Sequence, residues 1–310
     1  MTAMAGPGAP IDLRGSASRR RYEGSIRAIL LAASILSVLI SAGIVLTLIF
    51  EAISFLTQID LSQLFAPGWF PRRGMYSIPT VLAGTLIVTV IAITIAAPIG
   101  LASAIYLSEY ASSRTRKTIK PILEILAGIP SVVLGFFALT WISPNIVETI
   151  FNTSSSFSLM AAGIGVGILT IPLVASISED AMRAVPVSLR EASYGLGARR
   201  LTTSLRVVVP AGISGIVAAM LLAVSRAIGE TMVVAIAAGA SGGSLFTLDP
   251  LGPGQTLTGA MAALATGSDQ VTGASSAFQS LFFLGLLLFL MTLALNIIGD
   301  AFVRRTRQTY

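Results

Sequence analysis

The apolar positions of the chain fall into six long blocks that are separated by polar segments. The blocks lack the strict alternation of a half-buried strand, and at about 1.5 Å per residue each is long enough to cross about 30 Å of hydrocarbon as a helix. We therefore predict an all-α membrane protein with about six transmembrane helices. Their expected ranges are 28–50, 78–107, 121–143, 159–178, 208–238 and 277–299.

The Lys and Arg residues gather in alternate connections between these blocks. Cytoplasmic loops are enriched in Lys and Arg, so the pattern predicts that both termini are cytoplasmic. The chain then divides into a cytoplasmic tail, residues 1–27, a transmembrane domain, residues 28–303, and a second cytoplasmic tail, residues 304–310. Of the 20 Lys and Arg residues, those outside these tails and the loops 108–120 and 179–207 are Arg72, Arg73 and Arg226.

The amino-acid composition excludes several classes of protein function. Hydrophobic residues make up 54% of the chain and charged residues 11%, less than half of the roughly 25% usual in soluble domains. Cys and His are absent, which removes thiolate and imidazole chemistry and their metal sites. Neither Lys117 nor Lys120, the only two lysines, lies in a G-x-x-x-x-G-K-[ST] phosphate loop. We expect no catalytic residue, no metal and no bound cofactor, and a role in moving something across a bilayer.

Two charged residues lie inside the fifth block. Arg226 and Glu230 are four residues apart, so they share one face of a helix and can pair. A charge at the bilayer centre costs at least about 2.5 to 3.5 kcal/mol on insertion scales. One interpretation is a self-neutralising pair that packs the helix against its neighbours. The other is an anion path in which Arg226 meets the substrate while Glu230 orients it and limits its affinity.

The loop 179–207 carries the signals of a short helix. Pro186 suits the start of a helix, and Gly195 and Gly197 suit its end. Taken alone, this pattern also fits a simple connector whose arginines follow the positive-inside rule.

A family resemblance favours the more specific interpretation. The run Glu191, Ala192, Ser193, then Gly197, then Val207–Pro210 resembles the E-A-A, G, I-x-L-P signature of ABC importer permeases, with Ser for the second Ala and Val for Ile and Leu. In that family the segment is a coupling helix that docks on the ATPase subunit. The resemblance implies polar contact for Glu191, close packing for Ala192 and Ser193, and a turn at Gly197. The motif closes with Pro210.

A second set of motifs is more specific. The run from Arg226 to Thr231, R-A-I-G-E-T, resembles a stretch of phosphate-specific ABC permeases, as do residues 104–110 and 124–135. The resemblance covers roughly residues 78–296 and favours the PstC-type subunit over its PstA-type partner. Within it, Gly128, Pro130 and Gly135 are expected to allow a bend and close helix packing.

The resemblance implies a type I (MetI-like) importer permease of the bacterial cytoplasmic (inner) membrane. Its expected partners are a second permease, two copies of an ATPase that uses ATP, and an external phosphate-binding protein. Sulfate or molybdate is the alternative substrate within this architecture. A channel or carrier that works without an ATPase, and a structural or signalling membrane protein, are the alternatives from other classes.

Overall fold

The computed structural model describes residues 17–239, 243–267 and 275–306 and divides the chain into two units, Met1–Phe50 and Glu51–Tyr310. The first unit contains most of helix α1 (Ala17–Gln58), which continues beyond its predicted end at residue 50. An 18-residue window within the segment Tyr22–Gln58 has a mean hydropathy of 2.7 and is not buried within the chain. A long helix that is apolar around its whole circumference is typical of a membrane span.

The described residues contain five helices that are long and apolar enough to cross a membrane, or six if one bent pair forms a single span. This agrees with the predicted number. Helix α2 (Ile78–Ile105), helix α6 (Leu159–Arg183) and helix α13 (Ser275–Thr306) occupy three of the predicted ranges. The five-residue π-helix η3 (Tyr106–Tyr110) continues directly from α2.

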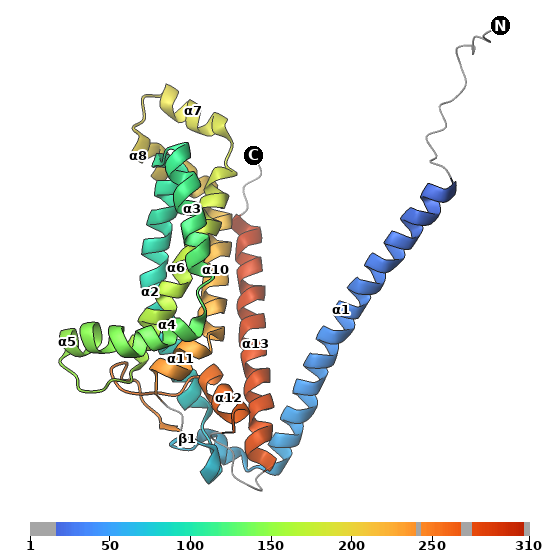
Figure 1. The fold of residues 1–310 in the computed structure, drawn as a ribbon, viewed down its shortest axis with the longest axis vertical. Helices are drawn as coiled ribbons and strands as arrows, with labels where there is room; N and C mark the ends of the chain where they lie inside the picture. Colours follow the sequence, from blue (N-terminus) through green and yellow to red (C-terminus); the bar gives the residue numbers. More distant parts are fainter. Residues whose placement is uncertain (1–16, 240–242, 268–274, 307–310) are drawn as a thin grey trace. The chain divides into compact units, whose positions relative to one another are not determined.

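Helices α2 and α6 are packed side by side in the centre of the second unit (Figure 1). Glycines allow this contact, because a Cβ at Gly163 would lie 2.7 Å from Ile91 and a Cβ at Gly100 would lie 2.7 Å from Val174. Small residues at a helix interface let two backbones approach closely in a membrane. The two helices therefore form one tightly packed pair.

The predicted single helix at residues 121–143 is wrong. The chain instead forms α3 (Ser113–Ala127), α4 (Ser131–Phe137), the π-helix η4 (Ala138–Val147) and α5 (Glu148–Phe151). Helix α3 begins early because the Ser112 hydroxyl accepts the Thr115 N–H at 3.1 Å. It ends at Gly128 because Pro130 lacks an N–H and disfavours helical geometry at the residue before it. The segment from α4 to α5 lies across the bundle (Figure 1).

The predicted continuous helix at residues 208–238 is also wrong. Its elements are α8 (Arg200–Thr203), the π-helix η5 (Ser204–Val208), α9 (Val209–Ala211), α10 (Ile213–Gly229) and α11 (Met232–Ala237). The axis bends by 72° at Gly212, shortly after Pro210. A second break follows Gly229, where Glu230 has an extended backbone with ψ 125°.

One end of the second unit holds a small sheet and a short helix. Strands β1 (Gly68–Phe70), β2 (Met75–Tyr76) and β3 (Ser244–Leu245) form an antiparallel sheet in the order β2-β1-β3, with the 3₁₀ turns η1 (Leu61–Phe65) and η2 (Pro71–Arg73) beside it. Phe55, Trp69 and Tyr76 pack edge to face beneath it. Helix α12 (Leu257–Ala265) begins at Thr256, whose hydroxyl accepts the Gly259 N–H.

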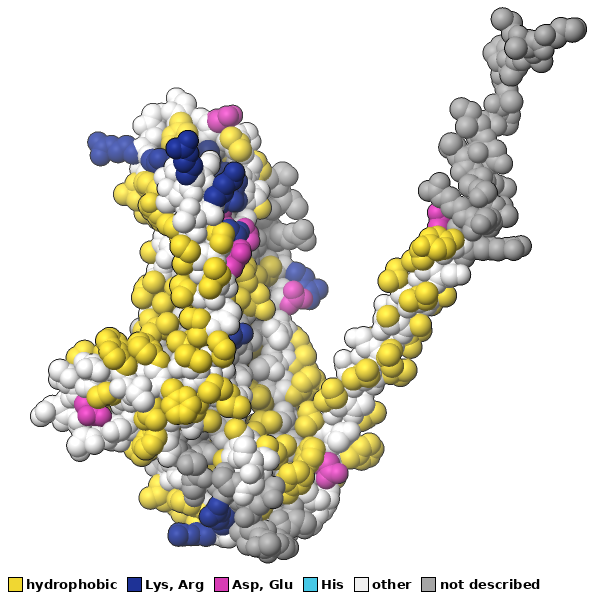
Figure 2. Space-filling model, viewed as in Figure 1, with side chains coloured by type: hydrophobic (Ala, Val, Ile, Leu, Met, Phe, Trp, Pro, Cys, Tyr) yellow, Lys and Arg dark blue, Asp and Glu magenta, His cyan; other side chains and the backbone are white. Residues whose placement is uncertain are grey.

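The opposite end of the unit is positively charged. It contains the basic side chains of α3 and α8 and the short helix α7 (Val187–Gly195). Figure 2 shows Lys and Arg side chains gathered at this end, with hydrophobic side chains over the middle of the molecule. We refer to it as the basic end.

Candidate functional site

Arg226 lies in the last turn of α10 on a face that the chain leaves exposed. Leu222 and Gly229, one turn to either side, are exposed with it, whereas Ala223 and, two turns earlier, Ala219 are buried. The neighbouring Ser225 hydroxyl is buried without a hydrogen-bond partner. The guanidinium therefore lies on an open strip of a helix that is otherwise packed into the bundle.

Glu230 is not placed on the same helical face as Arg226. The helix ends at Gly229, and the Glu230 carbonyl oxygen accepts a hydrogen bond from the Thr258 hydroxyl of α12 at 2.7 Å. Its carboxylate lies 3.5 Å from the Val233 N–H. No ion pair joins Arg226 to Glu230 within the ranges that the structure describes, so the expected helical pair does not form.

A lone guanidinium on a membrane helix must face water or another protein, because lipid gives it no partner. A guanidinium also offers a planar set of N–H donors that match the oxygens of an oxyanion. The exposed Arg226 guanidinium can therefore bind an oxyanion that reaches this face of α10.

Helix α7 occupies most of the predicted coupling segment and begins directly after Pro186. Ser193 faces the bundle, and its hydroxyl lies 2.8 Å from that of Thr203. Gly197 has a φ of 77°, which glycine adopts without strain. Ala192 is exposed in this chain, so its close packing in contact with an ATPase subunit stays a prediction.

The outer face of α7 is apolar and open. Leu196 is 90% exposed, and Val187 and Tyr194 are also exposed, next to the exposed Glu191. Apolar side chains displayed together beside a charge are typical of a protein contact surface. Pro210 lies outside this face, in α9 near the bend at Gly212.

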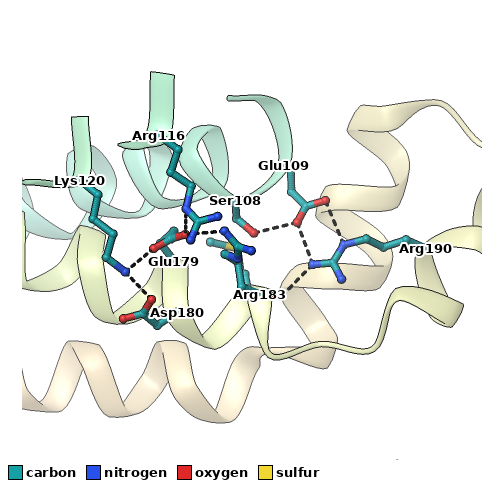
Figure 3. Close-up of polar contacts among 9 residues, drawn as sticks. Ser108, Glu109, Arg116, Lys120, Glu179, Asp180, Arg183 and Arg190 are labelled. Atoms are coloured by element: carbon teal, nitrogen blue, oxygen red, sulfur yellow. Dashed lines mark hydrogen bonds and ion pairs between the residues drawn. The ribbon is translucent and has the colours of Figure 1, made fainter. Parts of the chain in front are cut away.

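An ion pair holds the inner side of α7. Glu109, in η3, accepts hydrogen bonds from Arg190 of α7, with Nη2 to Oε1 at 3.0 Å and Nε to Oε2 at 3.4 Å (Figure 3). The Ser108 hydroxyl donates to the same carboxylate at 2.8 Å. This contact joins the end of α2 to the coupling segment.

A second cluster surrounds Glu179, near the end of α6 (Figure 3). Its side chain is fully buried and lies 2.8 Å from Arg116 Nε and 2.8 Å from Lys120 Nζ, both in α3. Arg183 is 3.9 Å away, and Lys120 also contacts Asp180. The cluster fastens α3 to α6.

One member of this cluster, Lys120, has a shifted pKa. Burial lowers the pKa of the Lys120 ammonium, but its hydrogen bonds to Asp180 and Glu179 outweigh this effect and raise that pKa above its ordinary value of 10.5. A raised pKa stabilises the fold below 10.5, and the effect is lost only as the pH rises through the higher value. The Lys120 ammonium is therefore charged at every physiological pH.

Sequence reasoning missed both clusters. It interpreted Arg116, Lys120 and Arg190 as topological charges and did not assign them partners. The available signal was the position of Glu109 and Glu179 at the ends of apolar blocks, next to basic loops. Carboxylates there are unusual, because these loops are otherwise strongly basic.

The three expected packing residues lie together around α4. Gly128 ends α3, Pro130 precedes α4, and the two form the break between these helices. Gly135 packs against α11, where a Cβ would lie 3.0 Å from Ile236 and 3.1 Å from the Met232 carbonyl oxygen.

The sequence of this chain matches a known protein family and several known proteins. Residues 96–308 match the family model of the binding-protein-dependent transport system inner membrane component. A probable ABC transporter permease protein of Bacillus subtilis (strain 168), YqgH, is 36% identical, over 67% of this chain and 69% of that protein. The phosphate transport system permease protein PstC of Pasteurella multocida (strain Pm70) is 30% identical, over 86% of this chain and 87% of that protein.

Solved structures show the same fold. A bacterial alginate ABC transporter in complex with its periplasmic protein contains a chain that matches with a TM-score of 0.64 at 15% identity, covering 94% of this chain and 99% of that one. The inward-facing MetNI methionine ABC transporter matches with a TM-score of 0.52 at 21% identity, covering 74% and 94%. The predicted importer-permease fold is confirmed, and this multi-pass membrane protein belongs to the binding-protein-dependent transport system inner membrane component family.

Proposed function

We propose that this chain is a permease subunit of an ATP-driven phosphate importer in the bacterial cytoplasmic membrane. The observation that carries the proposal is Arg226 on the exposed face of α10, within the R-A-I-G-E-T motif and without an ion pair among the residues that the structure describes. The relatives named as phosphate transport permeases support the choice of substrate. The chain supplies the passage, and ATP is hydrolysed by a separate subunit.

The remaining partners follow from the same proposal. A second permease of PstA type covers the open strip of α10, so that the passage runs between the two chains. Two ATPase subunits contact the pair at the basic end, one of them through the outer face of α7. An external phosphate-binding protein delivers the anion on the opposite side. Both termini are then cytoplasmic, as the distribution of Lys and Arg along the sequence predicts.

The passage must attract phosphate without retaining it. Phosphate carries one or two negative charges near neutral pH, so a path of low dielectric constant needs a cation. Arg226 supplies that cation and can bind two oxygens at once. A second cation would hold the anion too tightly for release, whereas the nearby Glu230 carboxylate weakens the attraction.

Reconstitution tests the substrate. The purified assembly of two permeases, ATPase dimer and loaded binding protein is expected to import phosphate into vesicles and to hydrolyse ATP faster when the binding protein carries phosphate. Binding protein without anion serves as the control. Uptake of sulfate or molybdate in place of phosphate, with the matching binding protein, would assign the chain to another oxyanion. Transport by this chain without the ATPase would contradict an ATP-driven importer.

Replacing Glu191 by alanine tests the coupling surface. We expect the variant complex to assemble and to import about tenfold less phosphate per ATP hydrolysed, since one charge-assisted hydrogen bond contributes about 1.5 to 3 kcal/mol. The measurement is phosphate uptake and ATP hydrolysis in the same vesicles. Ser188→Ala, at another exposed position of α7, is the matched control and should leave the ratio unchanged. An unchanged ratio in Glu191→Ala would remove this residue from the contact.

A further inference from the structure

Arg190 contacts two elements besides its own helix. Its guanidinium binds the Glu109 carboxylate in η3, and it also donates to the carbonyl oxygens of Met182 and Val185, each at 2.8 Å. Met182 belongs to α6, and Val185 lies in the short connection from α6 to α7. One side chain of α7 therefore holds the ends of both α2 and α6.

These contacts are shielded from water. The Glu109 side chain is 3% exposed and the Arg190 side chain is 16% exposed. Charged hydrogen bonds are stronger where the local dielectric constant is low, and an unpaired charge there is costly. Leu189, the neighbour of Arg190, packs in the same place against the cluster that contains Ala104, Met182 and Val208. The junction combines an ion pair with apolar packing.

The helices that Arg190 holds, α2 and α6, are closely packed against each other. Gly100 and Gly163 bring α2 and α6 into direct contact, and the Glu179 cluster adds α3 to α6. Helix α10 also packs against this pair, with Ala223 beside Ala96 and Val174, but its axis is interrupted by the bend at Gly212 and by the break at Glu230. Arg190 therefore links α7 directly to α2 and α6, while α10 has a point of bending at each end.

We propose that Arg190 is a positioning residue that fastens α7 to the α2–α6 pair, so that movement of the coupling helix is passed to the bundle as one body. The inference rests on the proposed function and names the contact through which ATP-driven motion reaches the passage. Energetic coupling between distant sites is carried by contiguous packed and hydrogen-bonded groups, and this junction is contiguous from the outer face of α7 to the core. Without the Arg190 contact, α7 moves with the ATPase but α2 and α6 do not follow it.

Two conservative variants test the contact. Arg190→Lys keeps the charge but lacks the planar fork, and Glu109→Gln keeps the shape but removes the charge. In the reconstituted complex, each is expected to lower phosphate imported per ATP hydrolysed by about tenfold, in line with the loss of a charged hydrogen bond. ATP hydrolysis should still respond to the loaded binding protein, and all subunits should still co-purify. Arg199→Lys, an exposed arginine in the same loop, is the matched control.

A covalent rescue separates transmission from a merely structural role. The chain has no cysteine, so in a complex whose partners also lack reactive cysteines, Glu109→Cys with Arg190→Cys provides one pair for a short bismaleimide. The double variant should be uncoupled before bridging and should regain most of its coupling ratio after bridging.

The outcomes are distinguishable. If the wild-type complex fails to import phosphate, the proposed function is wrong. If the wild-type complex imports phosphate and the Arg190→Lys and Glu109→Gln variants keep the wild-type ratio, the inference about Arg190 is wrong. It is also wrong if uptake and ATP hydrolysis fall together and bridging restores neither.

Discussion

Phosphate uptake is expected to fall by about 100-fold or more when Arg226 is replaced by alanine, while the complex still assembles. Truncating one partner of a desolvated charge pair costs about 2 to 5 kcal/mol, and each 1.4 kcal/mol is a factor of ten. The side chain lies on an exposed strip and makes no ion pair in the described residues, so its removal leaves no buried partner unsatisfied. Uptake into vesicles and co-purification of the subunits are the measurements.

Two further variants sharpen this result. Arg226→Lys keeps a positive charge without the planar fork, so its uptake should lie between those of the wild type and the alanine variant. Leu222→Ala changes the same exposed strip one turn away and should leave uptake close to the wild-type rate. Unimpaired uptake by Arg226→Ala would show that phosphate passes without this cation.

A second large effect is expected on stability. Replacing Glu179 by alanine removes the fully buried carboxylate between Arg116 and Lys120, and breaking such a pair destabilises a protein by about 3 to 5 kcal/mol. Total stabilities are only about 5 to 15 kcal/mol, so a large share of the stability should be lost and the variant should unfold at a clearly lower temperature. The measurements are the yield of monodisperse permease and its thermal unfolding temperature in detergent.

Asp180 provides the matched control for this prediction. Its side chain contacts the same lysine but is 63% exposed, and exposed ion pairs contribute about 0 to 1 kcal/mol. Asp180→Ala should therefore unfold close to the wild-type temperature. Equal unfolding temperatures for Glu179→Ala and the wild type would show that the cluster does not hold α3 to α6.

The apolar blocks were sufficient to predict the number of spans but not their breaks. The interruption before α4 follows from Pro130 and was within reach of sequence reasoning, since proline restricts the residue before it. The break at Glu230 was not, because no proline marks it. It is accompanied by a tertiary contact, the hydrogen bond from Thr258 to the Glu230 carbonyl oxygen, which joins residues 28 apart in sequence.

The candidate site was also predictable only in part. Motif resemblance located Arg226 and the α7 segment, because both are encoded in short continuous runs. The contact of Arg190 with Glu109 joins residues 81 positions apart, and it depends on how α2, α6 and α7 meet in three dimensions. The positive-inside rule already explained each arginine of the basic loops by itself, so the sequence did not indicate that Arg190 has a carboxylate partner.

The break after Gly229 changes the electrostatics of the residue three positions before it. Aligned peptide dipoles place about half a negative elementary charge at a helix C-terminus, and α10 ends within one turn of Arg226. The carbonyl groups of that last turn partly compensate the guanidinium without using a side chain. These backbone carbonyl groups neither titrate nor change rotamer. The point at which α10 ends therefore sets how strongly Arg226 attracts a passing anion.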